Sequence, residues 1–206
     1  MKRALTFILA LTLCLACLVG CSCNNQDDTP SGMKLASSTS HYKLYVPEGW
    51  QINHSNGPVT SAQVSDTDIS NVYVTMYSAS AEFKTHEDYI ELLKKQFEDA
   101  GYKDVQFKEN GVDSKLGERY STTDEQGNKK MPYNAKDYVI TAKIAGNYYK
   151  YHIALALHGG VFYYVQFTFP QDNYGTDYSK IEDVSFNAYT NHKATLEQIL
   201  SAFKIS

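Results

Sequence analysis

The stretch that decides the fold is residues 136–169, which read KDYVITAKIAGNYYKYHIALALHGGVFYYVQFTF. Two glycine-containing pairs, Gly146-Asn147 and Gly159-Gly160, interrupt long runs of β-branched and aromatic residues. Such pairs between apolar runs are typical of the tight turns of β-hairpins. The stretch therefore predicts three consecutive antiparallel strands joined by two-residue loops.

The register of the two predicted hairpins can be tested, because directly opposed residues share a face of a sheet. The first loop pairs Ile144 with Tyr149, and the second pairs Leu157 with Phe162. Both pairings place the same residues of the middle strand on one face: Tyr149, Tyr151, Ile153, Leu155 and Leu157. The opposite face carries its own bulky side chains: Val161, Tyr163, Val165, Phe167 and Phe169. We expect packed layers on both sides of the sheet, since both faces are apolar.

Helices are predicted on both sides of this stretch in the sequence. Thr85 and Asp88 form a capping-box pattern, and apolar residues follow at helical spacing until Gly101. A second helix is predicted near the C-terminus by Leu196, Ile199, Leu200 and Phe203. Alternating residues at 42–46 and 72–77 predict two further strands.

Two short motifs at the ends of this region carry a family resemblance. The first is Val46-Pro47-Glu48-Gly49-Trp50, and the second is the helix exit ILSAFKI at residues 199–205. Together with the strand order, they resemble the Mog1/PsbP-like superfamily, although Ala202 stands where Ser is commoner. The resemblance implies an α+β fold with a central antiparallel β-sheet and helices on both faces, an α/β/α sandwich. It also implies protein binding without catalysis.

The N-terminus has the pattern of an export signal. Lys2 and Arg3 precede an apolar run at residues 4–19, and the run ends in Leu18-Val19-Gly20-Cys21. These four residues resemble the lipobox of bacterial lipoproteins, which implies that Cys21 is acylated and becomes the first residue of the mature protein. The alternative is an uncleaved membrane anchor, but a run of 16 residues is shorter than the roughly 20 that a spanning helix needs.

The predicted organisation has three parts: 1–20, a lipoprotein signal peptide; 21–40, a lipidated flexible tether; and 41–206, a Mog1/PsbP-like domain. The length of 206 residues, 43% of them hydrophobic, suits one such domain. All four cysteines lie before residue 24, which excludes a disulfide framework or a cysteine zinc site in that domain. The net charge of −4 does not indicate the basic surface that nucleic-acid binding needs.

Catalytic and cofactor motifs are missing from the sequence. It contains no Gly-x-Ser-x-Gly, phosphate-binding glycine loop or His-Glu-x-x-His, so we expect neither a catalytic site nor a metal or other cofactor. Tyrosine is abundant, with 17 copies, and is enriched at protein interfaces. Tyr45, Tyr73 and Tyr77, on the more polar strand faces, are the interface candidates.

The function predicted from these features is that of a lipoprotein on the extracytoplasmic side of the cell membrane. It is anchored through Cys21 and acts as a non-catalytic protein-binding or assembly module whose partner is an envelope protein. Two alternatives stay open. One is an envelope hydrolase in which His152 or His192 meets a carboxylate and a hydroxyl only in three dimensions. The other is a small-ligand-binding lipoprotein.

Overall fold

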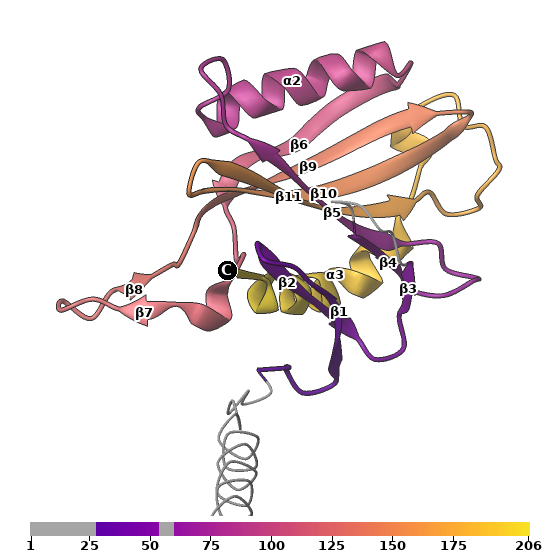
Figure 1. Cartoon of the computed structure of the whole chain (residues 1–206). Coiled ribbons are helices and arrows are strands. Elements are labelled where there is room, and N and C mark those ends of the chain that lie inside the picture. The colour runs from indigo at the N-terminus through magenta and orange to yellow at the C-terminus, as the bar shows by residue number, and fades with distance from the viewer. Residues whose placement is uncertain (1–27, 54–59) are drawn as a thin grey trace, which may run out of the picture.

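The computed structural model describes residues 28–53 and 60–206 (Figure 1). A seven-stranded antiparallel sheet forms the middle layer, with a helix on each side. The strands, in order across the sheet, are β3 (Gln51–Asn53), β4 (Thr60–Gln63), β5 (Asn71–Ser78), β11 (Val161–Pro170), β10 (Asn147–His158), β9 (Asn134–Ile144) and β6 (Lys103–Asp113). The fold class predicted from the sequence, α+β with helices on both faces, is confirmed.

Helix α2 (His86–Asp99) covers one face of this sheet. The predicted capping box begins it: the Asp88 N–H donates to Thr85 Oγ1 at 3.1 Å, and the Thr85 N–H donates to Asp88 Oδ2 at 2.9 Å. The apolar side of α2 is buried against the sheet face that contains Ile153 and Leu155. The first apolar face and its helix are therefore as the sequence predicts.

The opposite face packs against α3 (Asn187–Ala202) and a second, three-stranded sheet. The strands of the small sheet are β1 (Met33–Ser38), β2 (Tyr42–Pro47) and β12 (Lys204–Ile205), in the order β1-β2-β12. Phe167 and Phe169 of β11 lie in one buried cluster with Leu196 and Ile199 of α3. Both faces of the main sheet are therefore covered, as the sequence predicts.

The register of the first hairpin differs from the prediction. The loop is Ala145-Gly146, with φ of +49° and +82°, so that Tyr149 lies opposite Ala142 and not Ile144. Asn147 lies at the start of β10, where its side chain accepts a hydrogen bond from the Gly175 N–H at 2.7 Å. Because the shift is two residues, every side chain keeps its predicted face. The second hairpin has the predicted register, with Leu157 opposite Phe162.

The predicted flexible tether is too long at its C-terminal end. Strand β1 lies inside the range 21–40 and pairs with β2, so the folded body begins before residue 41. The pattern did not reveal this strand, because β1 is held by backbone pairing, while its Leu35 side chain is exposed. Cys21 and the signal at 1–20 lie outside the described residues.

Shorter elements complete the body: the 3-10 turns η1 (Glu118–Tyr120) and η2 (Ile181–Asp183), and the strands β7 (Thr122–Thr123) and β8 (Lys129–Lys130). Strands β7 and β8 form an arm that projects beyond η1 (Figure 1). Within the described ranges, no helix combines the length and the apolar character needed to cross a bilayer.

Candidate binding groove and histidine–carboxylate pairs

A groove of about 620 Å³ lies between α3, η1 and the segment that precedes β1. Its α3 wall is a single helix face, because the residues there recur at intervals of three and four. They are Ala194, Glu197, Gln198, Ser201 and Ala202. Lys115, Glu118 and Arg119 line the opposite wall, and Pro30 and Ser31 line one end.

A glycine holds the η1 wall against the end of α3. Gly117 has a φ of +73°, and its N–H donates to the Leu200 carbonyl at 2.8 Å. A Cβ atom at this position would lie 2.2 Å from Cε2 of Tyr133. The Tyr120 hydroxyl donates to the Ala202 carbonyl at 3.3 Å. Both bonds go to carbonyls in the last turn of α3, and they tie η1 to that end of the helix.

The acidic side chains of the groove are paired with lysines. Lys115 Nζ lies 2.7 Å from Glu197 Oε2, and Lys129 contacts Glu118. The hydrogen bond from Lys115 lowers the pKa of the Glu197 carboxyl below its usual range. Arg119 is exposed and forms no hydrogen bond or ion pair with any of the residues 28–53 and 60–206. The unpaired charge of the groove is therefore one guanidinium group.

Behind the Lys115–Glu197 ion pair lies a second cavity of about 140 Å³. It is lined by His152 and Asp137, whose Nε2 and Oδ2 atoms are 3.0 Å apart in a buried pair. Among the described residues, no partner is found for His152 Nδ1 or Asp137 Oδ1, and no hydroxyl is bonded to this histidine. The pair joins β9 to β10 and lacks a bonded nucleophile in this part of the chain.

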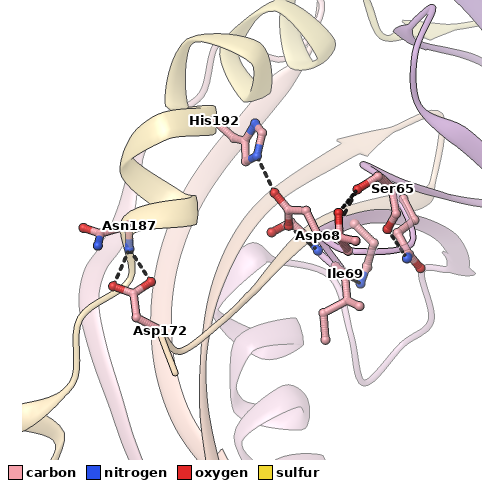
Figure 2. Close-up of polar contacts among 10 residues, drawn as sticks. Ser65, Asp68, Ile69, Asp172, Asn187 and His192 are labelled. Atoms are coloured by element: carbon pink, nitrogen blue, oxygen red, sulfur yellow. Dashed lines mark hydrogen bonds and ion pairs between the residues drawn. The ribbon is translucent and has the colours of Figure 1, made fainter. Parts of the chain in front are cut away.

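His192 forms the other histidine–carboxylate pair, with Asp68 of the β4–β5 loop (Figure 2). The distance from His192 Nε2 to Asp68 Oδ2 is 2.8 Å, and Asp68 also accepts a hydrogen bond from the Ser70 N–H at 3.0 Å. Burial acts to raise the pKa of Asp68, but the hydrogen bonds from Ser70 and His192 together outweigh it and lower the pKa. The pair fastens α3 to this loop.

His152 and His192 therefore each pair with a different carboxylate, Asp137 and Asp68. The alternative function, an envelope hydrolase, needs a hydroxyl hydrogen-bonded to the histidine. None of the described residues supplies one to His152 or to His192. Nor does this part of the chain contain a cluster of three or more His, Cys, Asp or Glu side chains that suits a metal ion.

The three tyrosine interface candidates have different environments. Tyr45 is only 2% exposed, so its prediction as a surface residue is wrong. The reason is that β2 is the central strand of the small sheet and is buried on both faces. Tyr73 is half-buried, and Tyr77 is 40% exposed with its ring 5.4 Å from that of Tyr89. An interface at Tyr77 or Tyr73 stays a prediction.

The sequence reasoning missed Gly117 and Arg119, the residues that shape and charge the groove. One signal was available for the second of them. Arg119 is the only arginine after Arg3 in the whole sequence, and all the other basic residues after Arg3 are lysines. No signal marked Gly117, because its role depends on Tyr133 and Leu200, which are far away in the sequence.

Comparison with known proteins finds several solved structures that are similar to this chain. No protein-family model matches the sequence, and no curated protein matches it. PsbP (CyanoP) of Synechocystis sp. PCC 6803 is 13% identical, with a TM-score of 0.49, over 90% of this chain and 98% of that chain. The Ran-binding protein Mog1p of Saccharomyces cerevisiae is 10% identical, with a TM-score of 0.47, over 80% of this chain and 89% of that chain.

LpqN of Mycobacterium tuberculosis, a protein involved in cell envelope biogenesis, is 10% identical, with a TM-score of 0.48, over 80% of this chain and 83% of that chain. A similar structure from Bacteroides thetaiotaomicron is longer, and this chain spans 49% of it. The similar structures include PsbP and Mog1.

Proposed function

We propose that the protein is a lipid-anchored, non-catalytic module on the extracytoplasmic face of the cell membrane, and that it binds an envelope protein. The observation that carries the binding role is the polar groove between α3 and η1, with its unpaired Arg119. The lipobox pattern that ends at Cys21 supports the anchor.

The groove lies close to the proposed anchor along the chain. Asp28 is held on the body by an ion pair with Lys204, 3.1 Å from carboxylate to amine, and Pro30 and Ser31 line the groove. The seven peptide steps from Cys21 to Asp28 can span at most about 25 Å even when fully extended. A lipid at Cys21 would therefore keep the groove near the membrane surface, where an envelope partner is available.

The charge of the body supports a need for the lipid. Without residues 1–20, the chain has 17 basic and 23 acidic residues, a net charge of −6. An acidic surface is repelled by anionic lipid headgroups. A membrane location consequently depends on acylation, and a single acyl chain gives only marginal binding, whereas two give stable binding.

The anchor is tested by membrane fractionation of two matched variants. Cys21→Ser should move the protein from the membrane to the soluble fraction, because it removes the acylated thiol. Cys23→Ser, two residues away, should leave it in the membrane. Retention of Cys21→Ser in the membrane would refute the lipid anchor.

The binding role is tested by filling the groove. Ala194→Trp places a large side chain on the exposed groove face of α3, while Ala81→Trp makes the same change at an exposed position in the loop between β5 and α2, outside the groove lining. After chemical cross-linking in cells, an envelope protein should co-purify with the wild type and with Ala81→Trp, and be lost with Ala194→Trp. Equal recovery with both tryptophan variants would refute a role for the groove.

A second candidate function is small-ligand binding, which the groove volume favours. Ligand pockets are typically about 300–1,000 Å³, and the groove has about 620 Å³. Equilibrium binding by the purified protein alone would distinguish this function from protein binding that requires a large interface.

A further inference from the structure

We propose that the groove binds a peptide through a carboxylate group, with Arg119 as the anchoring residue. This inference rests on the proposed function, because it names the chemical group by which a protein partner is recognised. The groove thus becomes a site for a free peptide C-terminus.

The charge of Arg119 is available to a ligand. Its guanidinium group is exposed on the groove wall and has no hydrogen bond or ion pair to any residue that the structure describes. The two groove carboxylates do not compete for it, because Glu197 is bound to Lys115 and Glu118 to Lys129. A guanidinium group presents a planar fork of donors that matches the two oxygens of a carboxylate.

Polar side chains beside the arginine can complete the recognition. Ser201 and Gln198 lie three residues apart on the α3 wall, and Ser31 lies at the end of the groove. None of these three side chains forms a hydrogen bond within residues 28–53 and 60–206. A hydroxyl or amide donor can take a lone pair of a carboxylate that the arginine leaves free. The groove therefore offers several unused donors around one positive charge.

The balance of charges favours a ligand with a single negative charge. The groove lining contains Lys115, Arg119, Glu118 and Glu197. Lys129, which lies outside the lining, pairs with Glu118 and Lys115 pairs with Glu197, so the local excess is the single positive charge of Arg119. One carboxylate neutralises the excess. A phosphate dianion carries a second negative charge that the single excess positive charge does not neutralise. A carboxylate is accordingly the better match.

The test is isothermal titration calorimetry with the full-length protein in detergent. The probe is N-acetyl-pentaalanine, whose only charge is its C-terminal carboxylate, and the matched probe is the same peptide with a C-terminal amide. Arg119→Gln removes the proposed anchor, Arg119→Lys keeps its charge without the fork, and Lys130→Gln removes a positive charge from the exposed β8 strand.

The free carboxylate peptide should bind to the wild type and to Lys130→Gln, and at least tenfold more weakly to Arg119→Gln. Arg119→Lys should be intermediate, and the amide peptide should bind at least tenfold more weakly to the wild type. Equal binding of both peptides, no binding of either, or tighter binding of inorganic phosphate would overturn the inference. If the calorimetry gives one of these results while Ala194→Trp still loses its partner in cells, the proposed function stands and only carboxylate recognition by Arg119 is refuted.

Discussion

The substitution Gly117→Ala tests how the groove wall is built. Gly117 has a φ of +73°, and a left-handed conformation costs a non-glycine residue about 1–2 kcal/mol. The new Cβ would also lie 2.2 Å from the Tyr133 ring, whose hydroxyl accepts a hydrogen bond from the Ile205 N–H at 2.8 Å. Overpacking of this kind typically costs about 1–3 kcal/mol. The expected loss in the free energy of unfolding is therefore about 2–5 kcal/mol.

Gly127→Ala is the matched control, because Gly127 also has a positive φ, +84°, but no atom lies within 4 Å of the position that its new methyl group would take. Its expected cost is about 1–2 kcal/mol from backbone strain alone. Both variants are compared by urea unfolding, followed by circular dichroism and by the fluorescence of Trp50, the single tryptophan.

With a slope of about 2 kcal/mol per molar urea, the Gly117→Ala midpoint should fall by about 1–2.5 M and the Gly127→Ala midpoint by about 0.5–1 M. Equal midpoints for the two variants would refute the reasoning, because they would show that Tyr133 moves aside without cost and that the close approach does not hold the wall.

Three further predictions concern stability. Thr85→Ala removes the Oγ1 acceptor of the α2 capping box and should cost about 1 kcal/mol in urea unfolding. Burial raises the pKa of three tyrosines to about 12: Tyr120, Tyr148 and Tyr189. Their neutral phenols contribute stability that is intact below the unfolded-state pKa of about 10 and is lost as the pH rises from about 10 to about 12, so urea midpoints should fall across this range. The lowered pKa of Asp68 contributes stability above the unfolded-state pKa of about 3.9 that is lost as the pH falls below it, so acidification should narrow the stability difference between wild type and Asp68→Asn.

Each of these predictions has an outcome that contradicts it. Thr190→Ala, a substitution at an exposed position of α3, is the control for Thr85→Ala. Equal losses in the free energy of unfolding for the two variants would contradict a stabilising role of the cap. Ultraviolet titration should show part of the tyrosinate absorbance appearing only with alkaline unfolding; a single transition near the normal pKa would contradict burial. If the difference in the free energy of unfolding between wild type and Asp68→Asn were the same at all pH values, the charge of the Asp68 carboxylate would not contribute to stability.

The parts of the fold that the sequence predicts are those determined by local patterns. Thr85 and Asp88 mark the start of α2 by themselves, and the alternation around Ile153 and Leu155 indicates two apolar faces. The first hairpin shows the limit of this reasoning, because Gly146 can be either the first or the second residue of a two-residue loop. In the observed register Asn147 bonds to Gly175 of a distant loop, a contact that the local pattern does not reveal.

The groove depends on contacts between distant segments, which a single sequence does not reveal. Its walls come from residues 30–33, 115–119 and 194–202, and the bond from Gly117 to Leu200 joins two of them. Strand β1 was missed for a related reason: it is stabilised by pairing with β2, so its side chains need not follow an apolar pattern. Tyr45 was misplaced because burial on both faces of β2 requires the small sheet to be known.

The most direct test of the account is a photo-cross-link from the groove in intact cells. A photoreactive residue at Ser201 should yield one adduct with an envelope protein, and the adduct should disappear with Arg119→Gln, while the same residue at the exposed Tyr174 should yield none. An adduct from Ser201 that persists with Arg119→Gln, or the same adduct from Tyr174, would contradict the claim that this groove binds the partner.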